Sequence, residues 1–335
     1  MKSKRIGVVM GGTTTREASL RCGKAIASTL EQACHDVSRI DLNSHKDPAE
    51  VLRKARVDIA FLALQGRYGE DGCVQGLLEL LRIPYTGSGV LQSALASDKL
   101  KAKELFRLHN VPTPAYYVYS GDTRRERILE THGSFGYPAI VKPRRGGGSV
   151  GVTRVDNADA LVAAIRAAAA YDGDVLVERF IRGREVTVAI LNGRVLGAIE
   201  VAPRTGIFDS AAKRDSSLID YHLPARLSPA LSTNVLSLAE RAASALDVAG
   251  AVRVDMLVTE NQNEYLLEVN TLPAITAGSP FARIADAAGF DLLEICESLI
   301  DQAALRVKIP IPAARKADVV SLGKPEERGL RVVTG

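Results

Sequence analysis

Three oxygen-bearing side chains, those of Asp255, Glu268 and Asn270, lie in two neighbouring strand-like runs of the chain. As adjacent strands these runs would bring the three side chains together, and their oxygen atoms are the ligands that Mg²⁺ prefers. Arg253 precedes Asp255 by two positions, so both side chains share one face of a strand. A fixed cation beside a metal site indicates a bound carboxylate or a developing negative charge. The same pattern also fits a half-buried strand pair whose charged side chains face solvent.

A second group of candidate residues surrounds a glycine-rich stretch at residues 144–151. The strand pattern before it ends near Lys142. Backbone amides of such a loop could cradle a triphosphate while the lysine neutralises it, but an exposed hairpin tip has the same composition. Glu178, at the end of the next strand pattern, could accept a hydrogen bond from an adenine amino group, and Glu185 could bind ribose hydroxyls. Each glutamate alone is also typical of a surface acid.

The elements that must position these residues begin with a buried-strand pattern at residues 5–10, followed by glycines and a helical pattern through Leu30. Strand, glycine-rich turn and helix are the opening of a βαβ unit. The turn has neither GxGxxG nor GxxxxGK[ST], so no nucleotide fingerprint is present there. Glu17 lies in the first helical turn, where it either complements the helix dipole or holds a substrate ammonium group.

The rest of the chain alternates strand and helix patterns, with few interruptions. Asp98 is expected to cap a helix that starts at Lys99, and the loop at residues 65–72 follows a strand end, where ligands of α/β sheets collect. The long polar loop at residues 203–221 is typical of a functional lid or of a disordered segment. Further strands are expected at residues 57–64, 138–143 and 174–181, a short strand and turn within residues 83–90, and further helices at residues 158–170 and 229–246.

Composition restricts the class of protein. The chain has 335 residues, 46% hydrophobic and 24% charged, which predicts a soluble protein of two or three domains. It has no apolar run of the roughly 20 residues that span a membrane, and its start does not read as a signal peptide. Its four cysteines show no zinc or disulfide spacing, which fits a cytoplasmic protein. With a net charge of +4 and no supporting motif, nucleic-acid binding is not expected.

Taken together, the motifs resemble those of the ATP-grasp carboxylate–amine ligases, and among them the D-alanine–D-alanine ligase family. The resemblance extends from about residue 5 to about residue 305 and rests on several segments in the same order. These segments are Gly11–Leu20, Gly66–Gly72, Tyr85–Val90, Asp98-Lys99, Val141–Pro143, Ser149–Gly151, Arg253–Asp255 and Glu268–Pro273.

The resemblance implies an α/β fold, α+β in part: a three-domain ATP-grasp fold with a Rossmann-like N-terminal domain. The expected divisions are an N-terminal substrate domain at 1–97, a central domain with the glycine-rich lid at 98–184, a C-terminal domain with the metal site and the 203–221 loop at 185–306, and a basic tail at 307–335, either solvated or disordered. ATP would lie between the central and C-terminal domains. A homodimer is usual in the family.

The family pattern also implies roles for single residues. The ATP-binding positions correspond to Lys99, Lys142, Ser149, Glu178, Ile181 and Glu185. The ligands of Mg²⁺ or Mn²⁺, with two ions expected, correspond to Asp255, Glu268 and Asn270. Among the residues of the reaction, Lys213 matches a loop lysine that reaches the terminal phosphate, and Glu17 the acid that holds the first ammonium group. Arg253 matches the arginine that stabilises the oxyanion, and Ser279 the serine that binds the second carboxylate.

Several amino-acid positions depart from the family pattern. Gln65 stands where the family has histidine, Gly148 where it has serine, and Arg214 where it has tyrosine, while Ala274 and Pro280 replace a glycine and a leucine. In the family, the acid, the serine and the tyrosine form a hydrogen-bonded set that closes the loop over the substrates. Of that set only Glu17 remains here, and a pairing of Glu17 with Arg214 is one hypothesis for the closed state.

Three functions therefore remain open. The first is a ligase that forms D-alanyl-D-alanine through an acyl phosphate, for synthesis of the peptidoglycan precursor. The second is a related ligase with another donor or acceptor, such as D-serine or D-lactate. The third is a non-catalytic ATP-binding paralogue. For all three functions we expect small-molecule ligands, and we expect neither nucleic acid nor a membrane as a partner.

Overall fold

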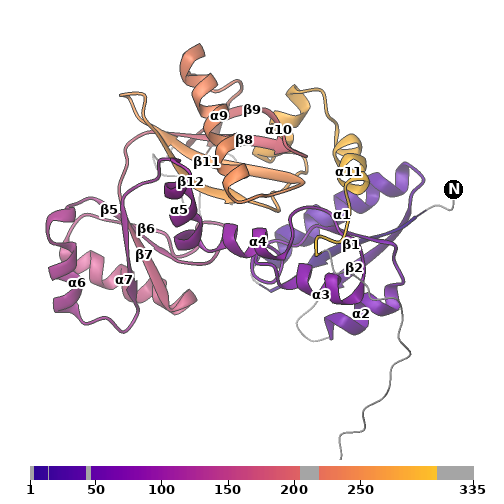
Figure 1. Cartoon of the computed structure of the whole chain (residues 1–335), viewed down its shortest axis with the longest axis horizontal. Helices are drawn as coiled ribbons and strands as arrows, with labels where there is room; N and C mark the ends of the chain where they lie inside the picture. Colours follow the sequence, from indigo (N-terminus) through magenta and orange to yellow (C-terminus); the bar gives the residue numbers. More distant parts are fainter. Residues whose placement is uncertain (1–3, 14, 43–46, 204–218, 308–335) are drawn as a thin grey trace, which may run out of the picture.

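Three sheets form the frame of the protein (Figure 1). The computed structural model describes residues 4–13, 15–42, 47–203 and 219–307. The five-stranded sheet lies between the N-terminal three-stranded sheet and the four-stranded sheet. This mixed helix-and-sheet architecture confirms the predicted fold class.

The N-terminal sheet is parallel and has the strand order β2-β1-β3. Its elements are β1 (Arg5–Gly11), α1 (Arg16–Gln32), β2 (Asp36–Leu42), α2 (Pro48–Ala55), β3 (Ile59–Leu62) and α3 (Cys73–Leu81). Ile6 and Val8 of β1 pack in one core with residues of α1, whereas Val9 packs in a second core with residues of α2 and α3. Both faces of the sheet are therefore covered, as in a Rossmann-like domain.

Two strand predictions in this region were wrong in extent. The run predicted at 57–64 is a strand only over Ile59–Leu62, and the run at 83–90 contributes single bridges from Tyr85 to Ala60 and Ala304. Pro84 has no N–H to donate to a ladder, and Gly87, with a φ of +89°, turns the chain. Regular pairing therefore cannot continue past Tyr85.

The second sheet is antiparallel, in the order β4-β7-β5-β6. Its elements are β4 (Tyr116–Ser120), α6 (Arg125–His132), the 3-10 turn η1 (Gly133–Phe135), β5 (Ala139–Pro143), β6 (Thr153–Val155), α7 (Ala158–Asp172) and β7 (Asp174–Arg179). Val141 and Val177 pack against α7. Because strand side chains alternate, Lys142 and Glu178 point to the opposite face. The strand predicted at 138–143 and the helix at 158–170 are confirmed, and the strand predicted at 174–181 is present but ends two residues early, at Arg179.

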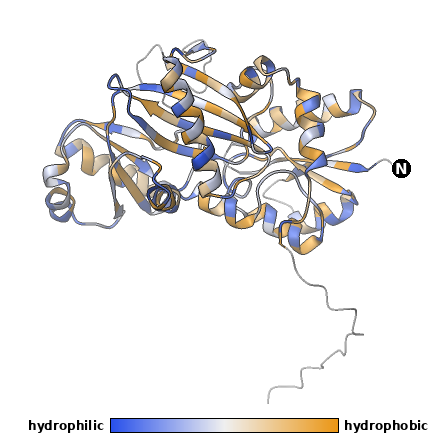
Figure 2. Cartoon of the chain, turned by 45° about the horizontal axis from the view of Figure 1, so that its top comes forward, coloured by the Kyte–Doolittle hydropathy of each residue, from blue (hydrophilic) through white to orange (hydrophobic). Residues whose placement is uncertain are grey.

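The third sheet is antiparallel, in the order β10-β9-β8-β11-β12. Its elements are β8 (Arg184–Leu191), β9 (Arg194–Pro203), β10 (Ile219–His222), α9 (Pro229–Ala245), β11 (Ala251–Val258), β12 (Glu264–Asn270), α10 (Pro280–Ala287) and α11 (Leu292–Asp301). One face packs against α9, and the other shares a core with α10, α11 and α1. This shared core joins the five-stranded sheet to the N-terminal sheet. Figure 2 shows how hydrophobic residues line the strands and the inner helix faces.

Helices α4 (Val90–Ser97) and α5 (Lys99–Leu108) connect the first sheet to the second. The Asp98 side chain accepts a hydrogen bond of 3.2 Å from the backbone N–H of Lys101, which confirms the predicted cap of α5. Ala102 and Phe106 of α5 pack into the core of the five-stranded sheet. The predicted divisions at 97, 184 and 306 stay predictions. Among the described residues, no helix is both long and apolar enough to cross a membrane.

Candidate active site

A cleft of about 1000 Å³ lies between the four-stranded and five-stranded sheets. It is lined by all six residues predicted as ATP-binding positions and by two of the three predicted metal ligands. These lining residues are Lys99, Lys142, Ser149, Glu178, Ile181, Glu185, Asp255 and Glu268. Lys142 and Glu178 lie on the face of the four-stranded sheet opposite α7, and Glu185, Asp255 and Glu268 lie on β8, β11 and β12 of the five-stranded sheet. Residues far apart in sequence thus converge on one cavity that is large enough for a nucleotide.

The predicted metal ligands meet across one antiparallel strand pair. Asp255 of β11 is paired with Glu268 of β12, and Arg253 is paired with Asn270. Cross-strand partners point to the same face, so two carboxylates, an amide and a guanidinium form one cluster. The Asn270 Oδ1 atom accepts a hydrogen bond of 2.9 Å from the backbone N–H of Leu272, which fixes the amide oxygen at the strand end.

The Arg253 guanidinium holds the carboxylates of this cluster together. Its Nε atom lies 3.0 Å from both oxygens of Asp255, and one terminal nitrogen lies 2.8 Å from Asp255 and 3.5 Å from Glu268. Burial alone would lower the pKa of Arg253, but the Asp255 and Glu268 carboxylates raise it above its ordinary value. Thr187 donates a further hydrogen bond of 2.8 Å to Asp255. The arginine therefore stays charged and has a fixed orientation.

The donor set fits a magnesium ion that is completed by phosphate oxygens. Within the described ranges, no cluster of three or more His, Cys, Asp or Glu side chains could bind a metal by itself. Two carboxylates and one amide leave several positions of an octahedron for water and nucleotide, which is the usual coordination of Mg²⁺ at nucleotide sites. All three donors are oxygen atoms, so the set also suits Mn²⁺.

Two lysines share one buried carboxylate at the floor of the cleft. The Glu178 Oε1 atom lies 2.7 Å from Lys142 Nζ and 2.9 Å from Lys103 Nζ. Burial alone would raise the pKa of Glu178, but the two ammonium groups hold it below its ordinary value. Burial lowers the pKa of Lys103 to about 8, although Glu178 opposes this shift. At neutral pH, the three side chains therefore carry a net positive charge, which suits a polyphosphate.

The glycine-rich loop between β5 and β6 is fixed at its root. Arg144 donates a hydrogen bond of 2.8 Å to Asp98, and Lys99 Nζ donates one of 2.6 Å to the carbonyl of Gly146. Towards the tip, Gly148 has a φ of +65° and is exposed. A Cβ atom at Gly148 would have Val150 Cγ2 as its nearest neighbour, at 4.0 Å. The loop thus presents its backbone to the cleft from an anchored base.

Glu70, in the loop after β3, lies beside the same cluster although the sequence did not single it out. Burial raises its pKa to about 7, with Arg253 and Lys99 opposing the shift and Glu268 adding to it. It also lies close to Gly147 of the glycine-rich loop, since a Cβ atom added to Gly147 would be 3.3 Å from the Glu70 Oε2 atom. The predicted loop at residues 65–72 therefore reaches both the glycine-rich loop and the carboxylate cluster.

Two family models match the chain. One, described as the C-terminus of D-ala D-ala ligase, matches residues 105–301, and one described as its N-terminus matches residues 41–88. The chain belongs to the D-alanine–D-alanine ligase family.

Individual relatives agree with this membership. A D-alanine–D-alanine ligase from Anaeromyxobacter sp. (strain Fw109-5) is 45% identical over 304 residues, covering 90% of this chain and 98% of the relative. The crystal structure of the Bacillus anthracis D-alanine–D-alanine ligase complexed with ATP is 32% identical, with a TM-score of 0.77 over 89% of this chain and 96% of that one. The crystal structure of the VanG D-Ala:D-Ser ligase from Enterococcus faecalis is 27% identical, with a TM-score of 0.78 over 90% of this chain and 99% of that one.

The residues that the family pattern assigns to the amino acids lie outside the lining of the large cleft. Glu17 is exposed in the first turn of α1. Ser279 is the N-cap of α10, and its hydroxyl oxygen accepts a hydrogen bond of 3.1 Å from Ala282 N–H, which leaves the hydroxyl proton free to donate. Lys213 and Arg214 lie outside the described residues, so the pairing of Glu17 with Arg214 stays a hypothesis.

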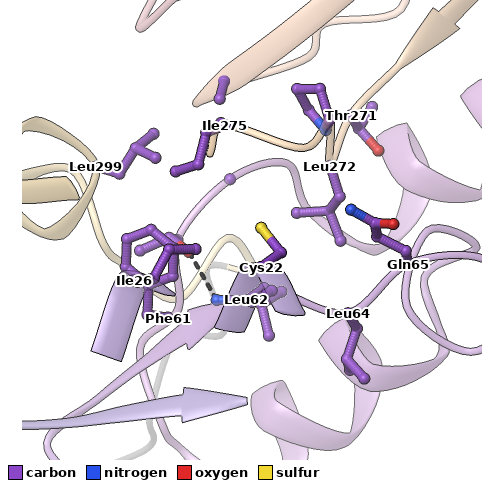
Figure 3. A pocket seen from close by; sticks show the side chains of 15 residues that line it. Cys22, Ile26, Phe61, Leu62, Leu64, Gln65, Thr271, Leu272, Ile275 and Leu299 are labelled. Carbon is purple, nitrogen blue, oxygen red and sulfur yellow. Dashed lines mark hydrogen bonds between the residues drawn. The ribbon is translucent and has the colours of Figure 1, made fainter. Parts of the chain in front are cut away.

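Gln65, which replaces the family histidine, lines a second and much smaller cavity (Figure 3). This space of about 20 Å³ lies where Cys22 of α1 and the end of β3 meet the segment after β12, including Leu272. A volume of that size accommodates about one water molecule. The cavity is therefore part of the packed joint between the N-terminal and five-stranded sheets, and it is too small for an amino acid.

Sequence reasoning missed Lys103 as well as Glu70. Lys103 lies four residues after Lys99 on α5, so both lysines are on one helix face, and this spacing was the available signal. No comparable signal marked Glu70, because its position depends on how the loop at 65–72 packs against residues almost 200 positions later.

Proposed function

We propose that this chain is an ATP-dependent ligase that joins two D-alanine molecules into D-alanyl-D-alanine. The observation that carries the proposal is the convergence of Lys142, Glu178, Asp255 and Glu268 on one nucleotide-sized cleft. Arg253 is fixed beside it by two carboxylates. Membership of the family supplies the reaction, and the site supplies the cationic and anionic groups that this reaction needs.

The cleft residues divide the binding of Mg-ATP between them. Lys99, Lys142 and the backbone at Ser149 would bind phosphate oxygens, Glu178 and Ile181 would contact the adenine, and Glu185 would bind the ribose. Asp255, Glu268 and Asn270 would hold the two magnesium ions. The ions would neutralise the phosphate charge, so that an anionic carboxylate can approach the γ-phosphorus.

The reaction then needs two displacements. In the first, a carboxylate oxygen of D-alanine attacks the γ-phosphorus and ADP leaves, which gives an acyl phosphate. In the second, the amine of another D-alanine attacks the acyl carbon, the C–O bond to phosphate breaks, and the amine releases a proton. Glu17 would hold the first ammonium group, Ser279 would hold the second carboxylate, and Lys213 would reach the terminal phosphate. Arg253 would stabilise the oxyanion of the second step.

A second candidate function is a ligase that joins D-alanine to another acceptor. Five residues differ from the family pattern, namely Gln65, Gly148, Arg214, Ala274 and Pro280, while the predicted ATP and metal positions are retained. Substitutions confined to the amino-acid side would change substrate choice and leave ATP use intact. The similarity to a D-Ala:D-Ser ligase fits this candidate.

The experiment is phosphate release from Mg-ATP with D-alanine alone and with D-serine, D-lactate and a panel of other amino acids, with the products identified by mass. Release with D-alanine alone, yielding the D,D-dipeptide, supports the first proposal. Release that requires another partner supports the second candidate. ATP binding without release in any mixture would refute both and indicate a non-catalytic paralogue.

The proposal also includes a cellular role and an oligomeric state. A D,D-dipeptide made by this chain would enter peptidoglycan precursors, and the enzyme would work in the cytoplasm as a homodimer. Its three units would be residues 1–97, 98–184 and 185–306. Light scattering after size-exclusion chromatography tests the dimer, since a monomer gives half the mass at every concentration.

A further inference from the structure

Lys103 is a buried lysine behind the cleft floor. Its side chain is fully buried, and it does not line the cleft, unlike Lys99 and Lys142. Its ammonium group forms an ion pair of 2.9 Å with Glu178 and a short hydrogen bond with the Thr113 hydroxyl. Since an uncompensated buried ammonium group is strongly unfavourable, a lysine at this position calls for an explanation.

Lys103 connects the two walls of the cleft. It lies on α5, whose residues Ala102 and Phe106 pack into the core of the five-stranded sheet, while its partner Glu178 belongs to the four-stranded sheet. Thr113 in turn donates a hydrogen bond of 3.0 Å to the carbonyl of Leu266 on β12. The ion pair therefore fixes Glu178 relative to the strand that carries Glu268.

We propose that Lys103 is a positioning residue that keeps Glu178 charged and in place while Lys142 turns towards the phosphates of bound ATP. The inference rests on the proposed ATP-dependent function. Glu178 has two ammonium partners, one facing the cleft and one behind it. When phosphate oxygens compete for Lys142, the ion pair with Lys103 remains, so Glu178 is not left as an unpaired buried anion.

The charges of the three side chains explain why Lys142 alone could not both pair with Glu178 and bind phosphate. Without Lys103, Glu178 and Lys142 would form a neutral pair, and ATP could engage Lys142 only by leaving the Glu178 carboxylate unpaired in the protein interior. Breaking a buried pair in this way is strongly unfavourable. With Lys103 present, the three groups carry one net positive charge that is available to phosphate.

The test is a double-mutant cycle on the full chain, with ATP affinity measured by calorimetry in the absence of amino acids. The variants are Lys103→Met, Glu178→Gln and the combination of both. Lys101→Met is the matched control, because Lys101 lies on the same helix but is exposed and pairs only with Glu104 in the described structure, at 2.8 Å.

We expect Lys103→Met to raise the Kd for ATP about tenfold or more, since hydrogen bonds to charged groups have effects of this size. The ATP affinity of the Lys101→Met control should change less than about twofold. In the Glu178→Gln background, Lys103→Met should have no further effect on ATP affinity, because the neutral amide of that variant has no charge to compensate. In turnover, KM for ATP should rise more than kcat falls.

Two results would overturn the inference: an unchanged ATP affinity in Lys103→Met, or the same loss in both Glu178 backgrounds. If Lys103→Met does not fold by circular dichroism, Lys103→Gln takes its place in the cycle, since it retains a hydrogen-bond donor for Thr113. The cycle requires ATP binding but no turnover. If the proposed function is wrong, the wild-type protein will make no product, and this result does not depend on the double-mutant cycle.

Discussion

Replacing Arg253 by lysine tests the most strongly constrained group of the site. The guanidinium contacts both oxygens of Asp255 and one of Glu268, at distances between 2.8 and 3.5 Å. A lysine keeps the positive charge but offers one compact ammonium group, so it cannot keep this fork of contacts. Because Asp255 and Glu268 hold the guanidinium in one orientation, the donor aimed at the oxyanion would be lost together with the fork.

The expected loss in kcat is about 10²- to 10³-fold, equivalent to about 2.7–4 kcal/mol, which is typical for removal of one oxyanion donor. Stability should fall by only about 1–3 kcal/mol, because Asp255 keeps a charged partner and the hydrogen bond from Thr187. Phosphate release at saturating substrates measures kcat, and urea unfolding measures stability. Arg39→Lys, which alters an exposed arginine–Glu31 pair, is the control. An unchanged kcat in a folded Arg253→Lys enzyme would refute the assigned role.

Three further outcomes are expected. The Gly148→Ser variant should fold, with a free energy of unfolding lower by about 1–2 kcal/mol, because a Cβ atom has room there but the φ of +65° is unfavourable for serine. A larger loss in urea unfolding would contradict this. In the wild-type protein, the contribution of Lys103 to the free energy of unfolding should rise between about pH 8 and 10.5, because in that range its amine is protonated in the unfolded chain but not in the folded protein. Unfolding curves of Lys103→Met should lack that rise, and an identical profile would argue against the lowered pKa. Asp255→Asn should raise the Mg²⁺ concentration for half-maximal turnover by about tenfold or more, and an unchanged Mg²⁺ titration would remove Asp255 from the metal site.

The strand pair at the centre of the site could be predicted because its pattern is local. Apolar residues alternate with polar ones around Asp255 and Glu268, and alternation determines which side chains share a face. The sequence predicted that the two strands are neighbours, and the structure confirms this and adds the register that places Asp255 opposite Glu268. The cap at Asp98 was predictable for the same reason, since a cap depends on residues within one helical turn.

What could not be predicted depends on packing between distant segments. Lys103 finds its partner 75 positions later in the sequence, and apart from its spacing of four residues from Lys99 nothing in its own neighbourhood distinguishes it from the exposed Lys101. Likewise, the run at 83–90 has a strand-like composition, yet it forms only isolated bridges, one of them to Ala304 near the end of the described chain. Local propensity is a weak guide where tertiary contacts decide the outcome.

The distribution of hydrophobic cores indicates which wall of the cleft can move. One continuous core includes residues of the N-terminal sheet, α1, α10, α11 and the five-stranded sheet, whereas the four-stranded sheet packs in a separate core with α7. Relative motion of two bodies is easiest where few apolar contacts cross between them. The four-stranded sheet can thus move with its glycine-rich loop, while the Arg253 cluster stays fixed to the N-terminal sheet. Polar contacts such as Lys103 with Glu178 and Lys99 with the Gly146 carbonyl cross that boundary, so the groups that would bind ATP are also those that hold the two walls together.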